Sequence, residues 1–173
     1  IKMNHRFNLW AYARVDTVKN DALLEKMKRA GFNWLGIGVE SASAHVRDGV
    51  EKGRFGNDKI IEAVKRVSGH GINVGANYIF GLPDDTEASM QATLGLACEL
   101  KTPWANFYCA MAYPGSPLHK VAKGRGWFLP EDGPGWGAYS QHAFDTVPLK
   151  TDTLSSAEVL AFRDAAFQHY FTR

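Results

Sequence analysis

The regular alternation of strand-like and helix-like segments constrains the fold of this chain more than any other feature. Strand-like runs occur at Asn8–Val15, Asn33–Glu40, Asn73–Gly81 and Trp104–Tyr113. Helix-like segments of this length between strands predict βαβ units, with parallel strands and right-handed crossovers. The sequence therefore predicts an α/β fold. About four parallel strands with flanking helices form half of a (β/α)8 barrel, followed by a C-terminal loop and helix.

Helix starts are marked by residues that can cap the first turn. A side-chain oxygen there accepts a hydrogen bond from an unpaired backbone N–H group. The starts that we expect lie at Asn20, at Asn57, at an Asp84–Glu87 capping box and at a Ser155–Glu158 capping box.

The chain divides into two regions of different character. Residues 1–123 carry the alternating pattern and form the half barrel. Residues 124–173 comprise an aromatic-rich loop, which includes Trp127–Tyr139, and a last helix that packs on or extends the barrel. A loop of this length is more often functional than filler.

Composition and charge exclude several classes of protein. The 20 basic and 18 acidic residues give a net charge of +2 without a basic block, which disfavours generic nucleic-acid binding. No apolar stretch approaches the roughly 20 residues that span a bilayer. The two cysteines, Cys98 and Cys109, are unclustered, which fits a reducing cytoplasmic setting and no metal site within the chain. The chain starts at Ile1 without a signal peptide, so we expect a processed product or a part of something longer.

Two of the predicted strands carry glycines and polar residues on one face. Side chains alternate between the two faces of a strand, and the branched residues should pack beneath the helices. The opposite face should admit a ligand, because glycines leave room for close approach. That face carries Gly36, Gly38 and Glu40 in one strand, and Gly75, Asn77, Ile79 and Gly81 in the next.

Several of these polar residues also have simpler interpretations. Glu40 can cap the following turn, and Arg14 with Asp16 can form an ion pair at a strand end. Lys52 is a charged residue in an expected loop, and such residues are most often solvated. Asn77 is harder to explain structurally, because asparagine is depleted in strands and a buried amide needs partners. The six histidines lack ligand spacing and are expected at the surface or as capping groups.

Four motifs in order resemble the radical S-adenosylmethionine (SAM) superfamily. They are ARVDTV, AGFNWLGIGVESAS, GINVGANYIFGLPDDT and FYCAMAYPGSPLH. The resemblance covers Trp10 to His119 and looks closest to the group with an added cobalamin-binding domain. It implies SAM as cofactor, a 4Fe–4S cluster in the full-length enzyme, and cobalamin as a further candidate cofactor.

The resemblance also implies roles for individual positions. Glu40, with Ser41 beside it, would contact the ribose or methionyl group of SAM, and Lys52 would meet the methionyl carboxylate. Asn77 would face the ribose hydroxyls. The adenine would pack on Ile79 and Gly81 with backbone of the turn at Tyr113. Arg14 and Asp16 would approach substrate or methionine.

The chain departs from the family pattern in one respect. The cluster is held by three cysteines, usually as CxxxCxxC, and no such motif is present. We therefore expect the C-terminal part of the catalytic barrel, without cluster or radical chemistry of its own. Its partners would be the missing N-terminal half of the barrel and an unidentified substrate. The free edge at Asn8–Val15 predicts self-association.

Two other interpretations remain at this point. One is half of an unrelated (β/α)8 barrel enzyme, which is disfavoured because no strand ends in a Schiff-base lysine or a His-x-His pair. The other is a non-catalytic module that binds a partner through the aromatic loop, with Trp127 and Trp136 as contacts.

Overall fold

The computed structural model describes residues 5–50 and 55–172. Four strands alternate with helices, in the order β1 (Leu9–Arg14), α1 (Asp21–Ala30), β2 (Phe32–Glu40), α2 (Ala44–Asp48), α3 (Asn57–Gly69), β3 (Asn73–Phe80), α4 (Glu87–Leu100) and β4 (Trp104–Cys109). Then follow α5 (Pro117–Gly124), two 3₁₀ turns at Pro130–Asp132 and Trp136–Tyr139, and α6 (Ser156–Thr172).

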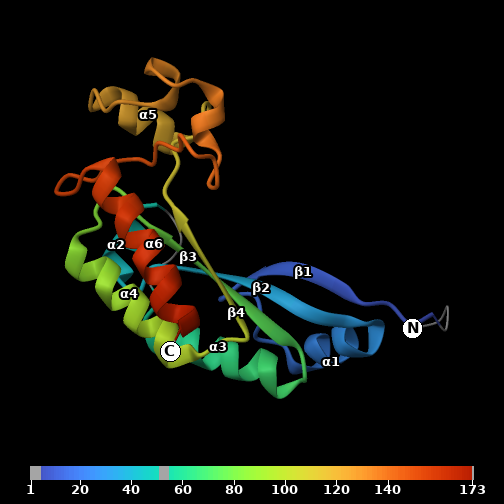
Figure 1. Ribbon diagram of the computed structural model, residues 1–173. Coiled ribbons are helices and arrows are strands. Elements are labelled where there is room, and N and C mark those ends of the chain that lie inside the picture. Colours follow the sequence, from blue (N-terminus) through green and yellow to red (C-terminus); the bar gives the residue numbers. More distant parts are fainter. Residues whose placement is uncertain (1–4, 51–54, 173) are drawn as a thin grey trace.

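The four strands form one parallel sheet in the order β1-β2-β3-β4, as the alternation predicts. Helices α1, α3, α4 and α6 lie along one side of this sheet (Figure 1). The α/β half-barrel architecture is therefore confirmed. The other face of the sheet carries no helix among the described residues.

The alternation of side chains along each strand explains which face the helices cover. Leu35, Ile37 and Val39 of β2 are fully buried beneath the helices. The same holds for Val74 and its alternating neighbours on β3. Burying such a branched side chain contributes roughly 1.5–3 kcal/mol each, so this layer dominates the stability of the sheet.

The helix boundaries confirm two of the predicted starts and correct two others. The Asn20 side chain accepts from the backbone N–H of Leu23, 3.1 Å away, and the Ser155–Glu158 pair caps α6. The prediction at Asn57 is wrong, because the N-cap is Gly56 and Asn57 is the first helical residue. The Asp84–Glu87 box is also wrong; the box is formed by Thr86 and Ser89.

Strand β4 ends earlier than its sequence suggests. It stops at Cys109, and the chain then leaves the sheet toward Pro114. At this point the Gln141 side chain occupies the outer edge of β4. Its amide nitrogen donates to the Cys109 carbonyl (2.8 Å), and its oxygen accepts from the Cys109 N–H (3.0 Å). The loop is thereby attached to the end of the sheet.

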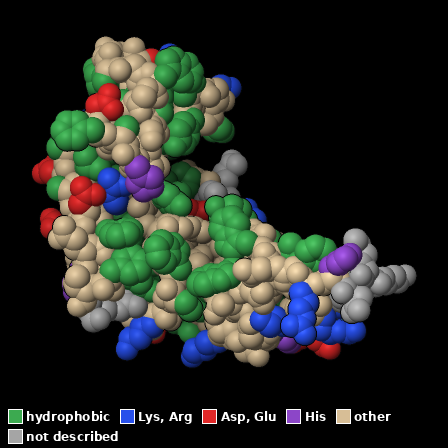
Figure 2. Space-filling view, turned by 45° about the vertical axis from the view of Figure 1, so that its right-hand side comes forward, with side chains coloured by type: hydrophobic (Ala, Val, Ile, Leu, Met, Phe, Trp, Pro, Cys, Tyr) green, Lys and Arg blue, Asp and Glu red, His purple; other side chains and the backbone are tan. Residues whose placement is uncertain are grey.

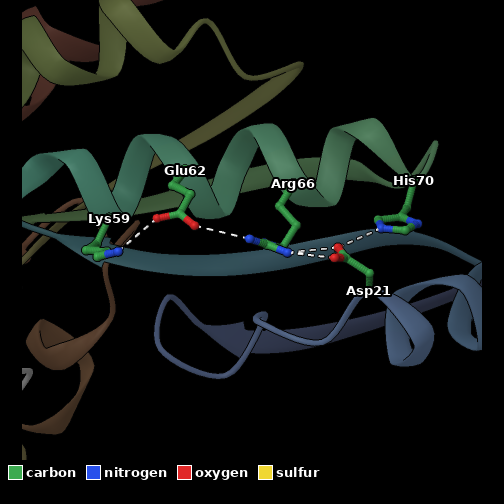
Figure 3. Close-up of polar contacts among 5 residues, drawn as sticks. All are labelled: Asp21, Lys59, Glu62, Arg66 and His70. Atoms are coloured by element: carbon green, nitrogen blue, oxygen red, sulfur yellow. Dashed lines mark hydrogen bonds and ion pairs between the residues drawn. The ribbon is translucent and has the colours of Figure 1, made fainter.

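Five polar side chains connect α1 to α3 on the outer surface (Figure 3). Arg66 binds Asp21 (2.8 Å) and Glu62 (3.1 Å), while His70 reaches the other oxygen of Asp21 (3.0 Å) and Lys59 pairs with Glu62. Most of these groups are solvent-exposed, so solvent screening keeps the contribution of the network to stability small.

Residues 110–149 form a small module beyond the carboxyl end of the sheet, around α5 (Figure 1). Trp127, a partner contact only under the alternative of a binding module, is buried in the core of this module, whereas Trp136 is exposed. His119, expected at the surface, is also buried. Its Nε2 lies 2.5 Å from Glu131, and Glu131 also accepts from the Tyr139 hydroxyl. This partly buried polar cluster joins α5 to the two 3₁₀ turns, and apolar packing also holds the module together.

In the view of Figure 2, hydrophobic side chains reach the surface of the small module, called the upper module below, and of the part of the protein that contains the sheet. A notch separates the two parts in this view. None of the helices described is long and apolar enough to cross a membrane. The division at residue 123 and the self-association through β1 stay predictions.

Candidate functional site

The uncovered face of the sheet is hollowed toward the carboxyl ends of its strands. Parallel sheets bind ligands at this end. The hollow has a volume of about 390 Å³, within the range of small-molecule sites. All four strands contribute to its lining, which comprises Tyr12, Ala13, Arg14, Gly38, Glu40, Asn77, Ile79 and Tyr108.

A directional chain of hydrogen bonds sets the orientation of the Asn77 amide. The Trp104 indole donates to the Asn106 oxygen (2.8 Å), and the Asn106 amide nitrogen donates to the Asn77 oxygen (2.8 Å). Within the described part of the chain, the Asn77 amide nitrogen makes no hydrogen bond. Asn77 therefore presents a donor to the hollow, which a ligand oxygen can accept.

Charged groups line the same hollow beside Asn77. The Glu40 side chain lies over Gly38, where a Cβ atom would meet the Glu40 carboxylate oxygen at 2.8 Å. Arg14 pairs with Asp16 through two bonds of 3.0 and 3.1 Å. Hydrogen bonding to Asp16 raises the pKa of Arg14, and the same pair lowers the pKa of Asp16. The simple ion pair at the strand end is thus present, and Arg14 lines the hollow as one member of it.

The other described residues predicted for the site do not line this hollow. The Ser41 side chain is fully buried, with its hydroxyl bonded to Thr93. At Gly81 a Cβ atom would meet Val159 of α6. The Tyr113 ring packs near that of Tyr139 in the upper module. Asp16 lines a separate depression beside α3, and Lys52 lies outside the described residues. The structure therefore brings together Arg14, Glu40, Asn77 and Ile79.

Sequence reasoning missed Tyr12, Asn106 and Tyr108. All three lie on the same face as the residues that were found, as strand alternation alone requires. The signal was available, because Asn106 is a second asparagine inside a predicted strand. Only the parallel register, in which Asn77 lies opposite Asn106, shows that the two amides meet.

A buried carboxylate holds the turn that follows β3. Asp85 accepts from the backbone N–H groups of Gly81 and Leu82, both at 3.1 Å, and from the Ser89 hydroxyl at 2.5 Å. Burial raises the pKa of Asp85 to about 6, although these three hydrogen bonds oppose the change. The folded protein therefore binds a proton at Asp85 over a pH range in which the unfolded chain has lost it.

This carboxylate predicts a pH dependence of stability. Between pH 4 and 6 the folded state holds more protons at Asp85 than the unfolded state, so stability falls as pH rises through this window. Asp85→Asn is expected to remove that fall, measured as the difference in the free energy of unfolding between wild type and variant. A difference that does not change between pH 4 and 6 would contradict the assignment.

Comparison with known proteins shows the family. The model of the radical SAM superfamily matches residues 11–97, about half of the chain. The chain belongs to the radical SAM superfamily. The matched segment begins within β1, includes β2 and β3, and contains Arg14, Glu40, Asn77 and Ile79.

Two curated relatives are methyltransferases by name. An uncharacterised methyltransferase of Pyrococcus horikoshii is 33% identical over 112 residues, which are 65% of this chain and 24% of the relative. Bacteriochlorophyllide d C-12(1)-methyltransferase of Chlorobaculum tepidum is 26% identical over 124 residues, which are 72% of this chain and 27% of the relative. The chain spans about a quarter of the length of these relatives.

Solved structures share the fold. Coproporphyrinogen III oxidase (HemN) of Escherichia coli, a radical SAM enzyme, superimposes with a TM-score of 0.63 at 16% identity, over 94% of this chain and 32% of HemN. The methyltransferase TsrM of Kitasatospora setae, solved with cobalamin and a 4Fe–4S cluster, gives 0.59 at 18% identity, over 67% of this chain and 22% of TsrM. The half barrel thus matches a part of larger radical SAM enzymes.

The described residues fit SAM but not the cluster. The hollow offers an amide donor, a carboxylate and an apolar wall at Ile79, which suit ribose hydroxyls and a flat base. The two cysteines cannot supply three thiolate ligands. Cys109 is buried among the helix-facing core residues, and burial raises its pKa to about 11. No group of three metal-ligating side chains occurs among the described residues.

Proposed function

We propose that this half barrel forms the ribose- and adenine-binding part of the SAM site in a radical SAM enzyme. The Asn77 donor, oriented by Asn106, is the observation that carries the proposal. It would donate to a ribose oxygen, and the Glu40 carboxylate would accept from the ribose hydroxyls. The adenine would pack on Ile79, and Arg14, which lines the same hollow, would attract the methionyl carboxylate.

The two curated relatives support methyl transfer as the reaction of the whole enzyme. When bound, SAM supplies its sulfonium methyl or its adenosyl group to the reaction. The cobalamin of TsrM supports cobalamin as a further cofactor, held outside the residues described. The chain's own residues would bind and orient the nucleoside; cluster ligands would come from elsewhere in the enzyme.

Competition between ligands tests this assignment. In the full-length enzyme we expect saturable 1:1 binding of SAM by calorimetry, with S-adenosylhomocysteine and methylthioadenosine as competitors and methionine alone as a much weaker one. The reason is that the contacts of this hollow are to ribose and base. Competition by methionine but not by either adenosine compound would contradict the proposal.

The isolated chain provides a complementary test. It contains one side of the pocket and no cluster ligands, so we expect weak SAM binding and no radical chemistry. Submicromolar SAM binding by the isolated chain would contradict the requirement for the remaining residues.

A further inference from the structure

The backbone at Glu40 has a conformation that non-glycine residues rarely adopt. Its φ angle is 66°, and the Ser41 N–H donates to the Val39 carbonyl at 3.0 Å across it. A hydrogen bond from residue i+2 to residue i around a positive φ is a γ-turn of the rare, strained type. The register with β3 shifts at the same place, between Gly38 and Glu40. Strain of this kind persists only where neighbouring groups impose it.

Thr93 of α4 binds the two residues that follow Glu40. Its hydroxyl donates to the Ser89 carbonyl (2.9 Å), so it must accept from the Ala42 N–H (2.9 Å) and from the Ser41 hydroxyl (3.2 Å). The Ser41 oxygen in turn accepts from the Ser43 N–H (3.1 Å). Thr93 is 1% exposed and Ser41 0%, so losing any of these bonds leaves a buried polar group unpaired.

Arg47 of α2 holds the same turn from another direction. Its guanidinium donates to the backbone carbonyls of Ser41 and Phe55 and lies 4.9 Å from the centre of the Phe55 ring. The Arg47 side chain is fully buried, and among residues 5–50 and 55–172 no carboxylate forms an ion pair with it. Its contacts are with main chain and an aromatic ring, so it ties the backbone at Ser41 to the backbone at Phe55.

We propose that Thr93 and Arg47 are positioning residues, which impose the γ-turn at Glu40 and so keep its carboxylate over Gly38 in the hollow. This inference rests on the proposed function, since the turn matters to ligand binding only if Glu40 contacts the ligand. Neither residue lines the hollow, and both act through Ser41. The strain at Glu40 is then maintained by nearby Arg47 and by Thr93, which is more than 50 residues away in sequence.

Thr93→Val tests the inference with an isosteric change. In the full-length enzyme it is expected to raise the dissociation constant of SAM about tenfold, because the turn relaxes and the Glu40 carboxylate moves. Thr93→Ser, which keeps the hydroxyl, should stay within about twofold of wild type. Arg47→Met should weaken SAM binding in the same way if the variant folds. The Thr93→Val result alone is enough to test whether these residues position Glu40.

Thr102→Val is the matched control. Thr102 is also buried, and its hydroxyl bonds the Trp104 carbonyl (2.8 Å) and lies 3.3 Å from the Tyr170 hydroxyl, at the opposite end of the sheet. The Thr102→Val variant should lower the melting temperature as Thr93→Val does, but it should leave the affinity for SAM unchanged. In a Glu40→Ala background, Thr93→Val should add less than about twofold, because coupled residues are not additive.

The outcomes separate the two claims. If the wild-type enzyme binds no SAM, the proposed function is overturned, and this inference with it. If the wild type binds SAM and Thr93→Val matches Thr102→Val, the inference alone is overturned. Full additivity of Thr93→Val with Glu40→Ala would overturn it as well, since Thr93 would then act independently of Glu40.

Discussion

Asn77→Leu is expected to raise the dissociation constant of SAM at least tenfold in the full-length enzyme. The change removes the amide that faces the hollow, and it also leaves the Asn106 donor without its acceptor. Each unpaired polar group costs about 1–3 kcal/mol, and about 1.4 kcal/mol corresponds to tenfold in affinity. Calorimetric titration with SAM measures the effect directly.

Asn33→Leu is the control for this variant. Asn33 lies near the amino-terminal end of β2 and also bridges two side chains, accepting from Lys28 and donating to Asn8, both at 2.9 Å. The Asn33→Leu variant should lose comparable hydrogen bonds without any change in its affinity for SAM. An unchanged dissociation constant for Asn77→Leu would remove Asn77 from the binding site.

Gly81→Ala is expected to destabilise the protein by about 2–5 kcal/mol. Gly81 has a φ of 79°, where a left-handed conformation costs other residues roughly 1–2 kcal/mol. Its new methyl group would also lie 2.5 Å from a methyl carbon of Val159, which is fully buried on α6, and overpacking of this kind costs about 1–3 kcal/mol. Urea denaturation measures the change in the free energy of unfolding, from the shift of the transition midpoint.

Gly95→Ala provides the contrast within the same protein. Gly95 lies inside α4, and a Cβ atom there would meet nothing within 4 Å. Removing a helical glycine should stabilise the protein by about 0.5–1 kcal/mol. If Gly81→Ala were as benign as Gly95→Ala, the close packing of α6 against the end of β3 would be wrong.

The strands could be predicted from sequence because a single physical rule controls them. Because one face of each strand is buried, branched residues recur at alternate positions of residues 35–39. The helices between successive strands then indicate that the strands run parallel. The helix starts follow no such single rule. Asp84 and Glu87 have capping-box spacing, but Asp85 and Thr86 compete for the same turn, and the buried Asp85 fixes which residue begins the helix.

The candidate site could be predicted only in part. Glu40 and Asn77 stood out because polar residues are unexpected among strand residues, and both line the hollow. The roles of Arg47 and Thr93 could not be found, because they depend on contacts between segments up to 52 residues apart. Arg47 in particular has the sequence context of an ordinary helical surface residue, yet it is fully buried.

The upper module shows the same limit. Its aromatic residues predicted a loop surface, but the partly buried cluster of Glu131, His119 and Tyr139 turns part of that loop into a packed unit. Hydrogen bonding to Tyr139 and His119 lowers the pKa of Glu131 to about 2, so its carboxylate is ionised at neutral pH. Such a cluster depends on residues from three short elements meeting, which local patterns do not specify.

A crystal structure of the full-length enzyme with SAM bound tests the central claim most directly. We predict that the ribose lies within hydrogen-bonding distance, about 2.7–3.2 Å, of the Asn77 amide nitrogen and the Glu40 carboxylate. The adenine should pack against Ile79. SAM bound with its ribose away from this hollow, while Asn77 keeps the orientation set by Asn106, would contradict the account.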